Sequence, residues 1–322
     1  ADLSEELDLH AGYVEVCQSV ARATEKPLVV MTNYSAWSHR KHAVRLSRSG
    51  VVVLDGTVSS LRAIKNAMTY RDFVAQKDLV ETVEPQNPKA AYWRSILEDR
   101  TTALTEDEGY TLLKDYGIRV PEFAIVETAA DVAAAARRVG FPLVAKTAEP
   151  GILHKSDVGG VVLNIEDEAQ AQAVYAELSA NLGPRVLLSA MASGDAEMAL
   201  GLVQDPQFGS FVMIAFGGLW IEILKDSQLA MVPVNRDVAE RRISDLKMAK
   251  VLEGVRGADP CDVPALIDTY IRFGNLVTDL GDHLAEVDIN PVLVSPKGVV
   301  AVDSLIIPNA ARAALEEQGH EH

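Results

Sequence analysis

The chain has 322 residues, 48% of them hydrophobic and 24% charged, which is the composition of a soluble globular protein with about two domains. Its 30 basic and 46 acidic residues give a formal net charge of −16, which argues against binding to nucleic acid or to anionic lipid. Cys17 and Cys261 lie too far apart in sequence to indicate a disulfide framework or a zinc site, and with no signal peptide or membrane-length apolar run we expect a cytoplasmic protein without a membrane segment.

The first part of the chain predicts a small parallel sheet. The apolar runs 27–32 and 51–54 are typical of buried strands, and the segments 35–50 and 57–76 are typical of the helices between and after them. Alternating strands and helices indicate a parallel sheet with crossover helices. Two strands are fewer than a doubly wound sheet normally has. We therefore interpret residues 1–80 as part of a domain whose remainder is absent or supplied by another chain.

Residues 81–104 are predicted to be a linker, because Pro85 and Pro88 lie there among polar residues. A second, α+β domain is predicted over 105–308, and it opens with a Thr-x-x-Glu capping box. A short helical tail is predicted over 309–322. The strands expected in the second domain are 123–126, 142–147, 161–165, 185–191, 196–203, 210–216, 219–225, 284–289 and 298–303, with helices at 105–116, 129–139 and 166–182 and further helices between 237 and 280.

Two features near the start of this domain carry chemistry. Lys146 lies inside an apolar strand, where a lysine needs either an anionic partner or a route to solvent. It is therefore either an outward-facing strand residue or a clamp for phosphate. The loop 150–160 contains three glycines, which allow a backbone to approach a ligand, and it places His154 next to a lysine, a serine and an aspartate. A histidine can act as a covalent acceptor; the alternative is an ordinary polar surface loop.

A third feature lies near the C-terminus. Strand alternation places Glu286, Asp288 and Asn290 on one face, and Asp303 follows a hairpin's length away. Carboxylate and amide oxygens are the ligands that Mg²⁺ prefers, and substrate phosphates usually complete its shell. A polar hairpin edge is the alternative. The Walker A, Gly-x-Gly-x-x-Gly, His-Glu-x-x-His and Gly-x-Ser-x-Gly motifs are all absent from the sequence.

The order of the motifs resembles the ATP-grasp domain of ADP-forming (NDP-forming) acyl-CoA synthetases, which are relatives of succinyl-CoA synthetase. The resemblance spans about residues 105–306, and residues 1–80 resemble more loosely the last flavodoxin-like subdomain that precedes ATP-grasp in fused members. It implies an α/β, partial flavodoxin-like parallel sheet followed by an α+β ATP-grasp domain. The motifs are Lys146, His-Lys-Ser-Asp-Val-Gly-Gly at 154–160, Asp-Pro-Gln-Phe-Gly at 205–209, Gly217-Gly218 with Glu222, Arg256-Gly257 and Asp-Ile-Asn-Pro at 288–291.

The resemblance implies a role for each matching residue. Lys146 would contact the phosphates of ATP or ADP, and His154 would carry a phosphoryl group between ATP and a distant acyl-CoA site. The other implied sites are the adenine-reading hinge Ser189, Ala190 and Met191, the ribose-binding Glu197, the glycines Gly217 and Gly218, and the Mg²⁺ ligands Asn290 and Asp303 with Asp288 close by. The sequence departs from the family in the hinge, which usually reads Gln-Glu-Met, and at Ala230, where an arginine is common.

The implied activity is that of an acid–thiol ligase, which converts ATP, a carboxylic acid and CoA into acyl-CoA, ADP and phosphate through an acyl phosphate and a phosphohistidine. CoA would bind mainly to a half that is absent here, supplied by the same protein or by a partner subunit in a homo- or hetero-oligomer. Two alternatives stay open. One is a non-catalytic ligand-sensing domain of a protein acetyltransferase, for which the hinge departure leaves room. The other is a stand-alone ATP-grasp carboxylate–amine ligase, against which His154 and the incomplete first domain argue.

Overall fold

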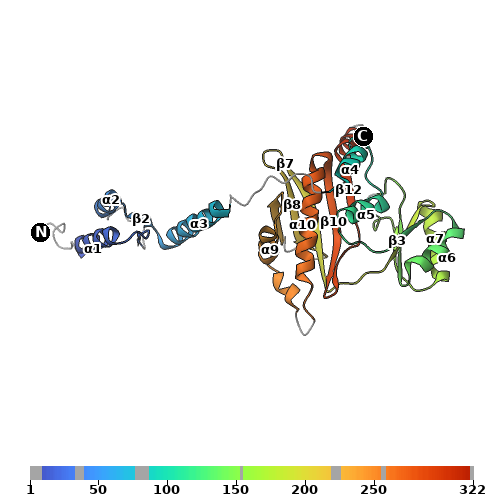
Figure 1. The fold of residues 1–322 in the computed structure, drawn as a ribbon, viewed down its shortest axis with the longest axis horizontal. Coiled ribbons are helices and arrows are strands. Elements are labelled where there is room, and N and C mark those ends of the chain that lie inside the picture. Colours follow the sequence, from blue (N-terminus) through green and yellow to red (C-terminus); the bar gives the residue numbers. More distant parts are fainter. Residues whose placement is uncertain are drawn as a thin grey trace. The chain divides into compact units, whose positions relative to one another are not determined.

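The computed structural model describes residues 9–32, 40–76, 87–152, 155–218, 226–254 and 259–319. The chain divides into two compact units, residues 1–82 and residues 83–322, which are called unit 1 and unit 2 below. Figure 1 shows the elements of both units. In the described ranges, no helix combines the length and the apolar character that crossing a membrane requires.

Unit 1 is built on a two-stranded parallel sheet. Strand β1 (Val29–Thr32) pairs with β2 (Val52–Asp55), and helix α2 (Arg40–Arg48) lies between them in the chain. Helix α3 (Thr57–Gln76) follows, and α1 (Leu9–Ala23) precedes the sheet. The parallel strand–helix–strand prediction is confirmed, whereas α1 was not predicted.

The small core of unit 1 explains why α1 belongs to it. Val14 and Cys17 of α1 pack with Leu46 and Val51, and all four side chains are buried. Cys17 is a buried free thiol, as is Cys261 in unit 2.

The larger sheet of unit 2 is antiparallel and follows the order β11-β10-β7-β8-β9, with β12 also paired to β10. Figure 1 shows helix α10 (Val263–Leu280) running along this sheet, with α9 (Arg236–Ser244) beside it. The strands are β7 (Ala196–Asp205), β8 (Gly209–Phe216), β9 (Ser227–Met231), β10 (Leu284–Ser295), β11 (Gly298–Ala301) and β12 (Leu305–Pro308).

The smaller sheet of unit 2 is also antiparallel and has the order β3-β6-β4-β5. Helices α6 (Ala129–Val139) and α7 (Glu168–Leu182) pack side by side on its outer face (Figure 1) and enclose a core of their own. The strands are β3 (Phe123–Val126), β4 (Leu143–Thr147), β5 (Val161–Ile165) and β6 (Val186–Ala190).

Two helices near the start of unit 2 support the larger sheet. Helix α4 (Ala90–Leu97) lies in the segment interpreted as a linker, and its Trp93 and Leu97 are buried in the main core. Helix α5 (Glu106–Asp115) follows the capping box, which Glu108 closes by accepting hydrogen bonds at 2.8 Å from the backbone and the hydroxyl of Thr105. The remaining elements are the short 3₁₀ helices Ala249–Glu253 and Gly281–His283 and the C-terminal helix α11 (Asn309–Gly319).

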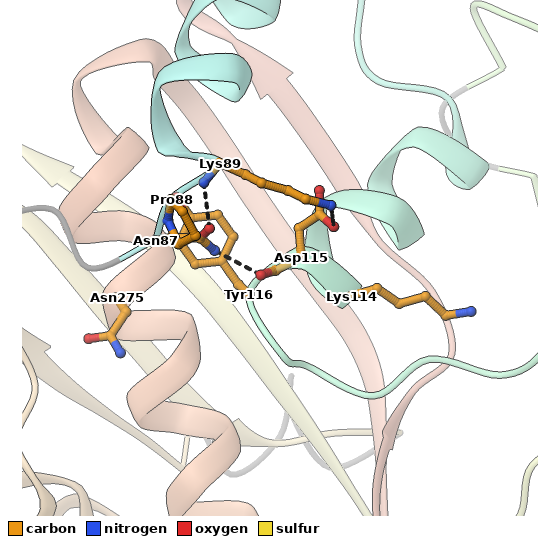
Figure 2. Close-up of a pocket in the computed structure, with 7 residues that line it drawn as sticks. All are labelled: Asn87, Pro88, Lys89, Lys114, Asp115, Tyr116 and Asn275. Atoms are coloured by element: carbon orange, nitrogen blue, oxygen red, sulfur yellow. Dashed lines mark hydrogen bonds and ion pairs between the residues drawn. The ribbon is translucent and has the colours of Figure 1, made fainter.

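Asp115 anchors the entry into unit 2. Figure 2 shows it at a surface hollow of about 410 Å³, where Lys89 Nζ lies 2.5 Å from Asp115 Oδ1 and Asn87 Nδ2 donates to the Asp115 carbonyl oxygen at 2.8 Å. The indole N–H of Trp93 donates to the other carboxylate oxygen at 3.0 Å. These contacts fix the start of unit 2 to the end of α5. None of the predicted site residues lines the hollow.

Two strand predictions and one strand that was not predicted need comment. The strand expected at 298–303 is interrupted: β11 ends at Ala301, and Asp303 lies in the connection to β12. The expected strand 219–225 lies outside the described residues, and β9, which follows it, was not predicted. Residues 227–231 contain a serine and a glutamine, so they lack the apolar run that marked the other strands.

Candidate functional site

A buried carboxylate lies between two lysines where the two sheets of unit 2 face α5. Oε1 of Glu106 is 2.6 Å from Lys146 Nζ, and Oε2 is 3.0 Å from Lys155 Nζ. The Glu106 side chain has no solvent-exposed area, and Lys146 is 6% exposed. The Lys146 ammonium also donates to the Val302 carbonyl oxygen at 2.5 Å and to the Tyr110 hydroxyl oxygen at 3.4 Å.

Strand alternation explains why Lys146 reaches this place. Leu143 and Ala145 of β4 point into the core under α6 and α7, so Lys146 points to the opposite face. All residues of β4 are buried, so the interpretation of Lys146 as an outward-facing residue is wrong. Glu106 is the anionic partner that a buried lysine requires. Contact of Lys146 with phosphate stays a prediction.

Asp303 completes a cluster of four charged groups. Its Oδ1 lies 3.4 Å from Lys155 Nζ and 3.8 Å from Lys146 Nζ. We call Glu106, Lys146, Lys155 and Asp303 the charged cluster. Burial alone would lower the pKa of Lys155, but the nearby Glu106 and Asp303 carboxylates outweigh it and raise that pKa. The Lys155 ammonium group therefore stays charged although little solvent reaches it.

The predicted metal ligands lie on the neighbouring strand. In β10, Val287 and Ile289 are buried while Glu286 and Asp288 are half-buried and Asn290 is exposed, which confirms the predicted alternation. Burial raises the pKa of Asp288, and the Glu286 and Asp303 carboxylates raise it further. Several acidic groups therefore act on one another here.

This donor set fits Mg²⁺. Among the described residues, no three His, Cys, Asp or Glu side chains form a ready-made metal cage. Mg²⁺ does not require one, because it is commonly held by one or two carboxylates together with substrate phosphates and water. A bound cation would offset the burial, and relieve the repulsion from Glu286 and Asp303, that together raise the pKa of Asp288. The role of Asp288, Asn290 and Asp303 as ligands stays a prediction.

The hinge lies at the end of β6. Ser189 is buried, and the backbone N–H groups of Ala190 and Met191 donate to the carbonyl oxygens of Glu122 and Pro142 at 2.8 and 3.0 Å. These two N–H groups are therefore used within the protein. Recognition of a base by this segment would have to use other backbone groups.

Glu197 lies next to the predicted glycine pair. The Gly217 N–H donates to the Glu197 carbonyl oxygen at 2.7 Å. Gly218 has φ +68°, and a Cβ atom there would lie 2.9 Å from Glu197 Oε2. Only glycine fits at 218 without moving the carboxylate. The structure thus brings Glu197 together with Gly217 and Gly218, although Glu197 precedes Gly217 by 20 positions in the sequence.

The predicted phosphoryl carrier His154 lies outside the described residues, as do Glu222 and the pair Arg256-Gly257. Glu106 was not predicted as a site residue. The only sequence feature that marks Glu106 is its position in the first turn of a capped helix. Acidic residues are common there, so the position does not indicate a site residue. The lysine signalled that a partner must exist but not which of the 46 acidic residues it is.

Comparisons with known proteins identify the family. Residues 95–307 match the ATP-grasp domain family. The β subunit of acetate–CoA ligase [ADP-forming] II from Pyrococcus furiosus is 35% identical over 222 residues, which cover 66% of this chain and 94% of that subunit. The ligase I β subunit from the same organism is 34% identical over 68% of this chain and 99% of that subunit. Acetate–CoA ligase [ADP-forming] I from Archaeoglobus fulgidus is 32% identical over 80% of this chain but only 39% of its own length.

Solved structures give the same result. Dinucleotide-forming acetyl-coenzyme A synthetase 1 from Ca. Korarchaeum cryptofilum, in complex with coenzyme A, Ca-AMPCP and HgCl⁺, is 32% identical with a TM-score of 0.64 and covers 69% of this chain and 100% of the matched chain. The fold and these matches define an ATP-grasp protein. The chain belongs to the family of ADP-forming acyl-CoA synthetases, in which it resembles the β subunit. It is the ATP-binding portion of such an acid–thiol ligase, as the order of its motifs predicted.

Proposed function

We propose that this chain binds ATP or ADP with Mg²⁺ and passes a phosphoryl group through His154 towards a carboxylic acid that becomes an acyl-CoA. The observation that carries the proposal is the charged cluster, in which the buried Lys146 and the largely buried Lys155 lie within 4 Å of Asp303, whose carboxylate acts on Asp288 of β10. One Korarchaeum structure, 33% identical with a TM-score of 0.60 and covering 69% of this chain and 99% of the matched chain, holds coenzyme A and Mg-AMPPCP with a phosphohistidine segment pointing towards the nucleotide site. That arrangement supports the same assignment here.

The residues divide into two ends of one nucleotide site. Lys146 and Lys155 bind the phosphates as point charges. Asp288, Asn290 and Asp303 hold Mg²⁺, which neutralises charge on the phosphate oxygens when bound. Catalysis of the phosphoryl step then consists of positioning and charge neutralisation, with little covalent work for these side chains.

The nucleoside end uses different groups. Glu197 is exposed and faces the glycine pair, so its carboxylate accepts hydrogen bonds from the ribose hydroxyls. The hinge Ser189, Ala190 and Met191 lies against the base. Because Ala190 and Met191 already donate their N–H groups, the hinge contributes to base binding through its remaining polar groups and its apolar surface.

His154 performs the covalent step of the proposal. A ring nitrogen bonds to the γ-phosphorus while the bond from that phosphorus to the ADP oxygen breaks, and the ring proton passes to solvent. The phosphoryl group then moves to a carboxylate, giving an acyl phosphate, and the CoA thiolate displaces phosphate from it. Two of the relatives are named β subunits. We therefore propose that a partner subunit, or another part of the same protein, supplies most of the CoA and acid sites.

The test is labelling with γ-labelled ATP and Mg²⁺, in the presence of the CoA-binding half. The expected result is protein-bound label that is acid-labile and base-stable, absent in His154→Ala and retained in the control His283→Ala. Nucleotide binding without label would favour the ligand-sensing domain. Amide formation with an amine acceptor and without CoA would favour a carboxylate–amine ligase.

A further inference from the structure

We propose that Glu106 is a positioning residue that holds the ammonium groups of Lys146 and Lys155 side by side at the phosphate end of the nucleotide site. The inference rests on the proposed function, because it takes the two lysines to meet nucleotide phosphates. Glu106 itself, fully buried beneath them, acts through the lysines.

The geometry gives one carboxylate oxygen to each lysine. Oε1 of Glu106 accepts a hydrogen bond from Lys146 Nζ at 2.6 Å, whereas Oε2 lies 3.0 Å from Lys155 Nζ in an ion pair without hydrogen-bond geometry. The lysines come from different elements, since Lys146 lies in β4 and Lys155 in the loop that follows it. Two ammonium groups so largely shielded from solvent, with no carboxylate between them, would repel each other strongly because the effective dielectric constant is low. The shared carboxylate keeps them together.

Glu106 is itself held firmly. It is the first residue of α5, a helix fixed at this end by the Thr105–Glu108 capping box. Its side chain has no exposed area, so water does not compete for its oxygens. Long lysine side chains lose much rotamer freedom when they are ordered, and a fixed anchor removes that loss from the ligand-binding step.

Asp303 cannot replace Glu106 in this task. In the part of the chain that the structure describes, Glu106 and Asp303 are the carboxylates paired with the two lysines. Asp303 lies farther from both ammonium groups, is 34% exposed, and belongs to the proposed metal ligands. When the Asp303 carboxylate binds a cation, Glu106 remains the carboxylate that orders the two lysines.

The experiment compares Glu106→Gln with Asp107→Asn in the full chain. Both changes remove one negative charge from the first turn of α5, so they alter the helix dipole alike. Asp107 instead pairs with Arg185, at 3.0 and 3.1 Å, and does not contact the lysines. Binding of Mg-ATP is measured by titration calorimetry and binding of adenosine by ligand-observed NMR, and the ratio of the two affinities reports the contribution of the phosphates.

We expect Glu106→Gln to weaken Mg-ATP binding about tenfold, the scale of one charged hydrogen bond, and to leave adenosine binding unchanged. Asp107→Asn should leave the ratio unchanged. Glu106→Asp keeps the charge but is one methylene too short to reach both lysines, so it should lose most of the phosphate contribution. It also provides the test if the glutamine variant does not fold.

Three other results would overturn the inference. Equal or tighter Mg-ATP binding by Glu106→Gln would mean that the carboxylate competes with phosphate. Parallel loss of Mg-ATP and adenosine binding would mean a general structural role. Failure of the unaltered chain to bind Mg-ATP would overturn the proposed function and this inference with it. That outcome is distinguished from the others because it is seen without any substitution.

Discussion

Lys146 determines much of the site around it because a buried ammonium group must be compensated. Desolvation of one such ion costs several kcal/mol, and excellent geometry with a counter-ion is required to offset it. Here the offset comes from Glu106, the Val302 carbonyl oxygen and the Tyr110 hydroxyl oxygen. Tyr110 in turn has a pKa raised well above its usual range, by burial and by the Glu106 and Asp303 carboxylates, so its hydroxyl stays protonated.

Replacing Lys146 by methionine should weaken nucleotide binding while preserving the fold. Methionine fills a similar volume, and Glu106 keeps Lys155 as its partner. We expect Mg-ATP affinity to fall at least about tenfold, because one charged hydrogen bond to phosphate disappears. Titration calorimetry measures this, with Lys114→Met, a largely exposed lysine of α5, as the control. Unchanged affinity in Lys146→Met would contradict its assignment to the phosphate end.

The acid stability of the chain should depend on Asp107. Burial raises the pKa of this carboxyl, but the hydrogen bond and charge of Arg185 outweigh it, so the pKa lies below its ordinary value of 3.8. The ionised form therefore stabilises the folded state above about pH 4, and this contribution disappears as the pH falls through the lowered pKa. Thermal melts should show Asp107→Asn below the unaltered chain at pH 7 and approaching it as the pH falls below 4 and through the lowered pKa of Asp107. A difference in melting temperature that stays constant as the pH falls would show that the pair with Arg185 does not make the stability depend on pH.

At the scale of elements, α5 packs against the connection between β11 and β12 through a glycine. A Cβ atom at Gly109 would lie 2.6 Å from the Ser304 hydroxyl oxygen, a group that is buried and, in the described structure, without a hydrogen-bond partner. Gly109→Ala should destabilise the chain by about 1 kcal/mol or more through overpacking. Adding Ser304→Ala should recover most of the loss. Denaturant unfolding of the two single variants and the double variant measures this coupling, and strictly additive effects would argue against the contact.

Local sequence rules predicted the elements that they govern. Strands β3 and β5 and helix α6 have the expected bounds, because apolar runs and terminal glycines mark them. Helix α1 was missed, although its buried Val14 and Cys17 pack on the sheet of unit 1. The interruption between β11 and β12 follows from pairing with β10, which depends on the rest of the fold.

The site divides in the same way. Alternation along β10 was sufficient to align Asp288 with Asn290, whereas along β4 it left open whether Lys146 faces outward or is buried. The partners of Lys146 could not be predicted, since Glu106 is 40 positions away and Val302 is 156 positions away. Such contacts depend on how α5 and the two sheets meet, a property of the folded chain that no local pattern encodes.

For the whole molecule, the division into two units carries a prediction of its own. Helices α4 and α5 and both larger cores belong to unit 2, and unit 1 has a separate small core. A fragment of residues 83–322 should therefore fold by itself and bind Mg-ATP with the affinity of the full chain to within about twofold. Calorimetric melting and titration of the fragment measure both properties. Loss of cooperative melting would show that unit 2 needs unit 1.

The two-stranded sheet of unit 1 has a consequence for handling the protein in the laboratory. Among the described strands β1 and β2 pair only with each other, so each presents one row of unpaired backbone groups, and Val52 of β2 and Leu61 of α3 are more than half exposed. Open edges of this kind are templates for further strand pairing. We therefore expect unit 1 to limit the solubility of the full chain. The fragment 83–322 should stay clear at concentrations at which the full chain scatters light.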